Sequence, residues 1–233
     1  MKPLFQIASL ALLVTLSTTG LVAQISLGIR GGLNLSKWSL NDEARYQFEI
    51  VGADRQENAG ALLGGVLVEI RLSNNLAIQP EVNYIQKGSK SVFAEADPDI
   101  TELYVVTMLD YVEAPLLLKV GTGFGAGRFD VLVGPSLGYA LSGMRRAKIT
   151  VAGRTVTSQE DVDFEQEEIR RTDVSAQVGA SLGLGLGSTA RLFVDGRYLI
   201  GLSNLPKDEQ SGGERATIRN RGIALTAGVL FSF

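Results

Sequence analysis

The last twelve residues, Gly222 to Phe233, alternate at every step between two kinds of position. Apolar residues such as Ile223 and Phe231 fall on one face, and mostly small or polar residues such as Ser232 fall on the other. A period of two is the repeat of a β-strand, because successive side chains of a strand point to opposite sides. The stretch therefore predicts a strand with one apolar face, which suits either a soluble sandwich or a membrane barrel.

The same alternation recurs along the chain, separated by polar or glycine-rich segments. Gly accounts for 27 of 233 residues, and these glycines recur inside the alternating segments, where a crowded barrel interior can use them. A length of this order fits one all-β domain. The eight expected strands lie near residues 25–36, 61–72, 76–87, 111–120, 128–141, 174–186, 191–200 and 222–233.

The connections between these strands are alternately long and short. In an up-and-down meander, this order puts every short turn at one end and every long loop at the other, which is the asymmetry of outer-membrane barrels. The sequence therefore predicts an eight-stranded antiparallel up-and-down transmembrane β-barrel over residues 24–233, located in the outer membrane. Its external loops are expected near residues 37–59, 88–101, 142–172 and 201–217.

The face opposite the apolar one carries five basic and five acidic side chains, interleaved with glycine and serine. In a soluble lipocalin-type barrel such charges point outward. A set of balanced sign instead suits the narrow interior of an eight-stranded barrel, because buried charges persist only when they are paired. The predicted polar network of the lumen is Arg30, Glu69, Arg71, Glu81, Lys87, Glu113, Lys119, Asp130, Asp195 and Arg197.

Aromatic residues mark both ends of the apolar face. Phenylalanines fall near the short turns and tyrosines near the long loops, as expected for side chains that sit at the two interfaces of a bilayer. This pattern favours an apolar face that points outward into lipid. The two predicted aromatic belts are Tyr84, Tyr139 and Tyr198 at one end and Phe129, Phe231 and Phe233 at the other.

Two local features modify this strand pattern. Pro80, Pro115 and Pro135 lie inside expected strands, where each removes a hydrogen-bond donor from the ladder, and we expect β-bulges there. Within the long segment 142–172, the dipeptide Ala152-Gly153 indicates a small hairpin.

The amino-terminus, residues 1–23, has the three parts of a secretory signal peptide. One lysine precedes an apolar core from Leu10 to Leu16, and small and polar residues lead to Ala23-Gln24. We expect cleavage here, and no cysteine follows that could carry a lipid anchor. Beyond residue 23, no apolar run approaches the roughly 18 to 20 residues that a membrane helix needs.

The chain contains no cysteine and no histidine. This absence removes thiol nucleophiles, disulfides, Cys or His metal sites and histidine-dependent catalytic triads. We therefore expect no catalytic residue, no metal site and no cofactor. Without residues 1–23 the chain keeps 21 basic against 25 acidic side chains, which argues against nucleic acid as a partner.

Several motifs resemble the PorT-type or "porin family" outer-membrane β-barrel domain of Bacteroidota. They are GGLNLS (31–36), IQPEVNYIQKGSK (78–90), YVEAPLLLKVG (111–121), GPSLGY (134–139), VDGRYLIGLSNL (194–205) and the terminal aromatic residue. The resemblance spans nearly the whole chain after residue 23 and implies an eight-stranded outer-membrane barrel. It says little about activity, but the family's named member is associated with the type IX protein secretion system.

Three functions follow as alternatives. The first is a non-enzymatic barrel that acts as a scaffold for extracellular loops, in adhesion, envelope integrity or a secretion assembly, with a secretion-system or extracellular partner bound through those loops. The second is a small-solute channel, although eight strands leave an interior that side chains fill. The third is an outer-membrane enzyme, but small barrels of that kind resemble one another in using histidine.

The acidic run from Glu160 to Glu168 could bind Ca²⁺ through its carboxylates. However, it lacks the spacing of an EF-hand, and the simpler interpretation is that water solvates it.

The terminal strand also resembles the signal by which barrel-assembly machinery recognises its substrates. That signal is a terminal aromatic residue with apolar residues at alternate positions before it. The simpler interpretation is that these side chains only face lipid and close the barrel against the first strand. The predicted assembly signal is Phe233, Phe231, Val229, Ala227 and Leu225.

Overall fold

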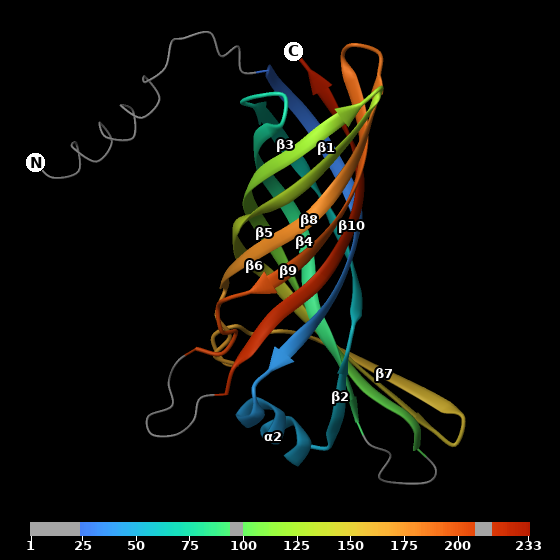
Figure 1. Cartoon of the computed structure of the whole chain (residues 1–233). Coiled ribbons are helices and arrows are strands. Elements are labelled where there is room, and N and C mark those ends of the chain that lie inside the picture. The colour runs from blue at the N-terminus through green and yellow to red at the C-terminus, as the bar shows by residue number, and fades with distance from the viewer. Residues whose placement is uncertain (1–23, 94–99, 208–215) are drawn as a thin grey trace, which may run out of the picture.

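The structure, a computed structural model, describes residues 24–93, 100–207 and 216–233 (Figure 1). The predicted signal peptide, residues 1–23, lies outside the described residues. The elements in chain order are β1 (Gln24–Leu40), α2 (Asp42–Ile50), β2 (Ala53–Glu57), β3 (Ala59–Arg71), β4 (Leu76–Phe93), β5 (Ile100–Phe124), β6 (Gly127–Val151), β7 (Arg154–Asp161), β8 (Thr172–Leu186), β9 (Ala190–Gly201) and β10 (Ile218–Ser232).

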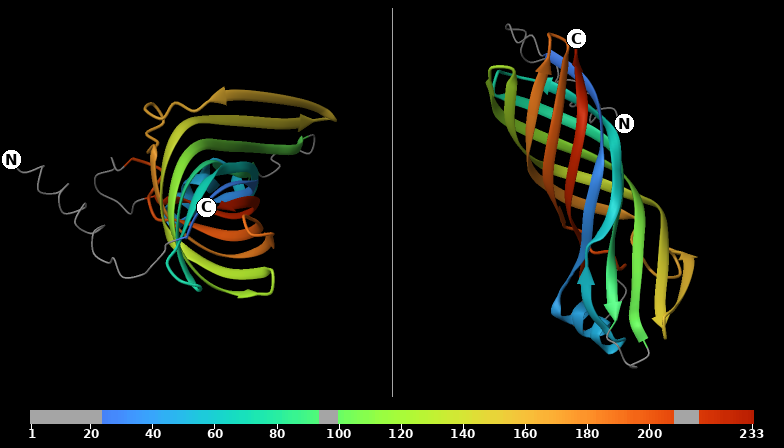
Figure 2. Two further views of the ribbon diagram at one scale, coloured as in Figure 1. Left: turned by 90° about the horizontal axis from the view of Figure 1, so that it is seen from above. Right: turned by 90° about the vertical axis from the view of Figure 1, so that its right-hand side faces the viewer.

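Eight of the strands form a closed ring in the order β1-β3-β4-β5-β6-β8-β9-β10. Every pair of neighbours is antiparallel, and β10 pairs with β1 from Ser26↔Ser232 to Leu40↔Ile218. The ring is visible along the barrel axis in Figure 2, and closure leaves it without a free edge. The predicted eight-stranded antiparallel up-and-down barrel is confirmed.

The remaining two strands lie outside the ring. β2 pairs with β4, and β7 pairs with β6. Together with residues 88–93, 100–110 and 142–151 of β4, β5 and β6, they make a sheet that leaves the barrel at the long-loop end and extends to one side (Figures 1 and 2). We refer to these segments as the projecting sheet.

The projecting sheet corrects the predicted loops. Most of the predicted loops 88–101 and 142–172 is strand, and the predicted loop 37–59 contains the end of β1, α2 and β2. The alternation of apolar residues fades in these segments because neither lipid nor a packed core covers one face. The backbone ladder nevertheless continues, since it needs no apolar side chain.

The predicted hairpin at Ala152-Gly153 is confirmed, because β6 and β7 pair on either side of it. Both residues have positive φ, 47° and 77°, as a two-residue hairpin turn of type I′ requires. At the start of α2, the side chain of Asn41 accepts a hydrogen bond of 3.0 Å from the amide of Ala44 and so caps the helix.

The expected bulges at the prolines are wrong. Pairing between β4 and β5 is interrupted after Pro80 but resumes in the same register, and pairing between β5 and β6 does the same after Pro115. A missing amide donor therefore removes ladder bonds without adding a residue. The bulge in this part of the ring lies instead between Asp110 and Tyr111, where the barrel passes into the projecting sheet.

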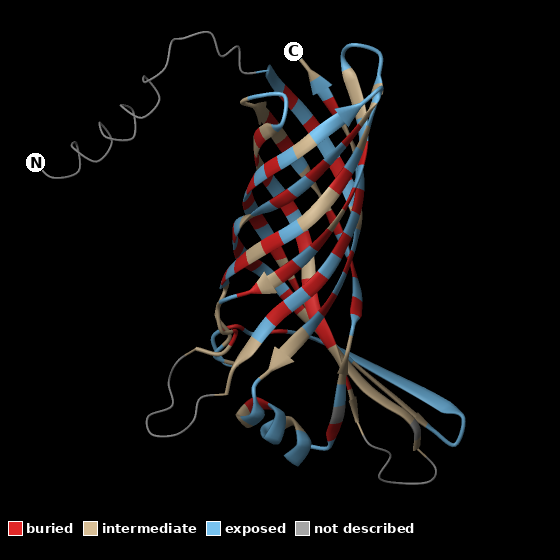
Figure 3. Cartoon of the chain, in the orientation of Figure 1, coloured by how far each residue is buried: buried red, intermediate tan, exposed pale blue. Residues whose placement is uncertain are grey.

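Burial alternates along every barrel strand, as Figure 3 shows. On β1, for example, Ile29 is 60 % exposed whereas the adjacent Arg30 is 6 % exposed. The ring is therefore apolar outside and largely polar inside, the inverse of a soluble barrel. Among the described residues no helix is long and apolar enough to cross a membrane, which does not bear on crossing by strands.

Candidate functional site

The candidate site is the barrel interior together with its mouth at the long-loop end. All ten side chains of the predicted lumen network point inward. Nine of these residues are buried, and the tenth, Arg71, keeps its side chain 18 % exposed. The structure arranges them in three layers along the barrel axis.

The central layer is built around Glu81 on β4. The guanidinium of Arg197 donates two hydrogen bonds to this carboxylate, of 2.8 and 2.9 Å, and Arg30 donates a third of 2.8 Å. Asp195 accepts from Arg30 at 3.2 Å, from Arg197 at 2.8 Å and from Thr226 at 2.7 Å. Two carboxylates and two guanidiniums from β1, β4 and β9 thus pair with one another across the barrel, although the Nε atoms of both arginines have no hydrogen-bond partner among the described residues.

The layer near the short turns is built around Glu69. Its carboxylate accepts from Lys119 at 2.8 Å, Arg71 at 2.6 Å and Arg191 at 2.5 Å. A second carboxylate, Asp130, pairs with Arg128 at 2.8 Å and lies 3.7 Å from Lys119. Arg128 and Arg191 were not among the predicted network residues, although both occupy inward positions in the alternation of their strands.

The layer nearest the mouth is built around Lys87. Its ammonium donates to Glu113 and to Asp173, each at 3.0 Å, and lies 5.1 Å from the ring centre of Tyr111. Asp173 was missed because the sequence pattern placed it at the edge of the predicted loop 142–172. Asn220 also donates to it at 3.2 Å.

One cavity inside the ring, lined by Asn34, Lys87 and Asn220, has a volume of about 10 Å³, room for at most one water molecule. Each side chain of the predicted network has at least one oppositely charged partner. The arrangement fills the lumen and resembles a packed core more than a pore.

An apolar plug lies at the mouth, next to the layer of Lys87. Val162 and Phe164, from the segment between β7 and β8, are buried with Leu109, Leu199 and Leu205 in one hydrophobic cluster. Neither Val162 nor Phe164 is among the predicted site residues. The signal available was the pair of apolar residues at 162 and 164, two positions apart inside the acidic run.

Backbone hydrogen bonds hold this plug in place. The amide of Val162 donates to Gly143 at 2.9 Å, and the amide of Arg170 donates to Leu205 at 2.7 Å. The amide of Lys207 donates to Glu168 at 2.7 Å, so both edges of the mouth are tied to the plug.

The acidic run makes ordinary structural contacts. Glu160 and Glu167 both pair with Arg145, and Glu165 pairs with Lys207 at 2.8 Å. Asp163 accepts hydrogen bonds from two backbone amides of the following turn. Within residues 24–93, 100–207 and 216–233, no three acidic side chains are grouped to hold a metal ion.

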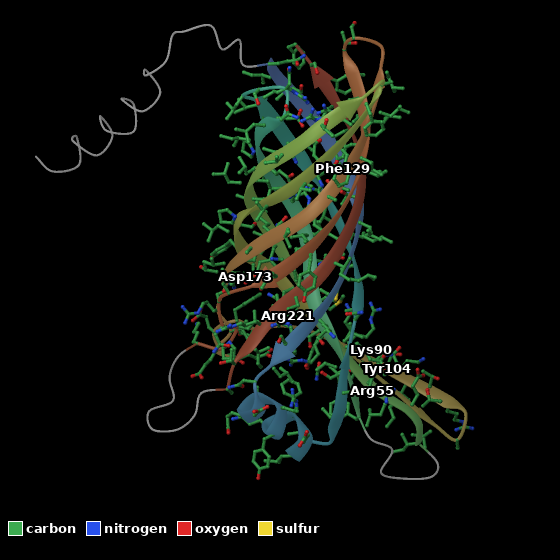
Figure 4. All side chains as sticks on the ribbon, viewed as in Figure 1. Arg55, Lys90, Tyr104, Phe129, Asp173 and Arg221 are labelled. Carbon is green, nitrogen blue, oxygen red and sulfur yellow. The ribbon has the colours of Figure 1, made fainter. Side chains whose placement is uncertain are left out.

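The outer surface carries the predicted aromatic residues. Those near the long loops are Tyr84, Tyr139 and Tyr198, exposed by 43, 53 and 40 %, and those near the short turns are Phe129, Phe231 and Phe233, exposed by 40, 48 and 82 %. Figure 4 shows Phe129 near the short-turn end and Arg221 toward the other. That the two sets mark the two interfaces of a bilayer stays a prediction.

The projecting sheet carries a cluster of charges around one tyrosine. The ammonium groups of Lys90 and Lys148 lie 4.5 and 5.5 Å from the ring centre of Tyr104 (Figure 4 labels Lys90 and Tyr104). A hydrogen bond from Lys148 lowers the pKa of Glu102, and one from Arg55 is the main cause of a lowered pKa at Glu57. These paired charges lie at the surface of the sheet, in water, and its strands are held together by the backbone ladder.

Comparison with known proteins gives a family. A model described as "Outer membrane protein beta-barrel domain" matches residues 18–206, which include every barrel strand except β10. No curated protein sequence matches the chain.

Solved structures similar to this chain are outer-membrane proteins of low sequence identity. Ail of Yersinia pestis, in complex with the heparin analogue sucrose octasulfate, is 11 % identical over 91 % of this chain and 100 % of its own, with a TM-score of 0.40. OprG of Pseudomonas aeruginosa is 10 % identical over 91 % of this chain and 97 % of its own, with a TM-score of 0.44. The outer membrane protease OmpT of Escherichia coli is 11 % identical over 93 and 99 %, with a TM-score of 0.35.

Proposed function

The chain belongs to the outer membrane protein beta-barrel domain family, and we propose that it is a closed, non-enzymatic barrel that holds a scaffold of extracellular structure above the outer membrane. The single observation that supports this proposal is that the barrel has a filled lumen and also carries an ordered projecting sheet. A barrel built for transport would leave its interior open, whereas this one is occupied by paired charges and plugged by Phe164.

The projecting sheet is the part of the scaffold best suited to contact a partner. All eight residues of β7 are exposed, and its outer edge pairs with no other described strand. The middle of this strand, Thr155 to Gln159, is uncharged, and an exposed uncharged edge can accept a strand from another polypeptide. The resemblance to PorT-type barrels makes a component of a secretion assembly the partner class that we propose.

A small-solute channel is the second candidate. The family label "porin" favours it, but the central ring of Arg30, Glu81, Asp195 and Arg197 would have to rearrange to let solute pass. An enzyme is the third, and the chain offers no histidine for the catalysis expected of small outer-membrane barrels.

The scaffold proposal is tested by removing the hairpin and keeping the barrel. Replacement of residues 146–159 by Asn-Gly joins Arg145 to Glu160, which already pair across the hairpin, through a favoured two-residue turn. We expect the shortened chain to reach the outer membrane at the wild-type level but to fail to correct the growth or envelope defect of a deletion strain.

The matched control is Ala152→Asn, which keeps the hairpin and suits the positive φ of that position. It should correct the defect fully. If the shortened chain corrects the defect as well as this control does, the hairpin is not the functional part and the scaffold proposal fails.

A further inference from the structure

Three basic side chains stand on the outward face of β1 and β10, at the long-loop end of the apolar band. Lys37 and Arg221 are direct partners in the register of these strands, and Arg219 follows Arg221 on the same face. All three are exposed. The next row toward the membrane is apolar, since Leu35 pairs with Ile223 there.

The facing pair is unfavourable by itself. Like charges directly opposite each other on a sheet are destabilising. No carboxylate of the described residues lies within 4.0 Å of Lys37 or Arg221 to offset it. The nearby Arg45 and Arg55, in contrast, have their own carboxylates at 3.3 and 2.8 Å.

A groove of about 440 Å³ lies at this corner, between α2, β2 and the wall of the barrel. It brings four basic side chains together with a single carboxylate, that of Glu49, and with three aromatic rings. Figure 4 labels Arg221 and Arg55 in the half of the molecule that carries α2. The charged residues of the groove are Lys37, Arg45, Arg55, Arg221 and Glu49.

The level of the groove suggests its ligand. The long-loop end of an outer-membrane barrel faces the cell exterior, and the apolar band beneath the groove contacts lipid chains. Basic side chains just outside such a band meet the anionic headgroups of the bilayer. We propose that this groove binds a phosphate group of an outer-leaflet lipid, with the acyl chains lying against Leu35, Ile223 and Tyr198.

The proposal is tested with the full chain that follows residue 23, refolded in zwitterionic detergent and titrated with lipid A. Native mass spectrometry gives the bound fraction. For Lys37→Gln/Arg221→Gln we expect the Kd to rise about 30-fold, about 2 kcal/mol, from about 1 kcal/mol for each basic side chain at an anionic surface.

Arg146→Gln/Arg154→Gln is the matched control, because it removes two positive charges from the β6–β7 hairpin, on the opposite side of the ring from β1 and β10. Its Kd should stay within about twofold of wild type. The swap Lys37→Arg/Arg221→Lys keeps both charges and should bind lipid A as wild type does. It therefore distinguishes loss of charge from damage to the fold caused by substitution at these positions.

A lipid site also differs from a general anion site. Inorganic phosphate at the same phosphate concentration should displace little lipid A, because it lacks the acyl chains that contact the apolar face. The proposal is overturned if the two double variants lose affinity equally, or if inorganic phosphate competes as well as the lipid does.

Discussion

Glu81 illustrates at the residue scale how a membrane barrel tolerates charge in its interior. Its carboxylate is buried and accepts from Arg30 and Arg197, while Gln79 and Asn83 donate to it from the same strand. A buried ion pair adds little stability by itself, but the loss of one partner leaves the other charge unpaired and costly. The network therefore fixes which side chains can occupy the lumen.

This reasoning predicts the effect of Glu81→Ala. The change leaves Arg30 and Arg197 with only Asp195 between them, and we expect the free energy of unfolding to fall by about 3 to 5 kcal/mol. Urea titration of protein folded in detergent measures it. Glu102→Ala is the control, because that carboxylate pairs with Lys148 in water and its loss should matter far less. Equal losses of unfolding free energy in the two variants would show that interior ion pairs contribute no more to stability than exposed pairs do.

Much of the lumen could be predicted from single residues, because strict alternation assigns each position in a strand to one side. Arg128 and Arg191 follow the same rule, because they are the first residues of the expected strands 128–141 and 191–200 and stand on the inward face. Asp173 also lies on the inward face, two residues before Ser175, and was missed because the expected strand began at residue 174.

At the scale of elements, β10 closes the ring and ends the chain. Phe231 pairs with Leu27 and is 48 % exposed on the outer surface, whereas Phe233 follows the strand and is 82 % exposed. On the predicted aromatic belt, lipid covers both rings. Burial of either ring then contributes on the order of 2 to 3 kcal/mol, so packing alone gives them similar weight.

We expect recognition by the assembly machinery to separate the two phenylalanines. Phe233→Ala should reduce the amount of protein in the outer membrane of cells more than Phe231→Ala does, while both variants refold about equally in detergent. Immunoblots of membrane fractions measure the first quantity, and electrophoretic mobility of the folded form measures the second. Equal amounts in the outer membrane would leave lipid-facing packing as the sufficient account of Phe233.

The strands inside the apolar band could be predicted to within a few residues, and the extent of the projecting sheet could not. Inside the band, lipid on one side and a packed interior on the other enforce a period of two. Around Tyr104 and Arg146 neither constraint applies, so strands there follow from backbone pairing between β5 and β6 and leave little trace in composition.

At the scale of the whole molecule, the barrel has two unlike ends. Tight turns at Asn74, Gly125 and Gly187 close the end that carries both described termini, Gln24 and Phe233. The other end carries α2, the plug and the projecting sheet (Figure 1). This asymmetry is expected of outer-membrane barrels, whose turns face the periplasm and whose loops face outward.

The absence of cysteine makes this topology directly testable. A single Ser158→Cys change places a thiol on β7, and Ser188→Cys places one in the turn between β8 and β9. A membrane-impermeant maleimide added to intact cells should label the first variant and not the second, and both should react after the cells are opened. Labelling at position 188 in intact cells would show that the barrel has the opposite orientation in the membrane.

The central claim, that the lumen is closed, is tested most directly by conductance. The unmodified chain after residue 23, inserted into planar bilayers, should give no steady channel at any applied voltage that the bilayer survives. The physical reason is that Glu69, Glu81 and Lys87 each stand in a separate paired layer beneath an apolar plug. A porin inserted under the same conditions serves as the positive control. Large, stable channels from this protein would contradict a closed scaffold and favour a channel.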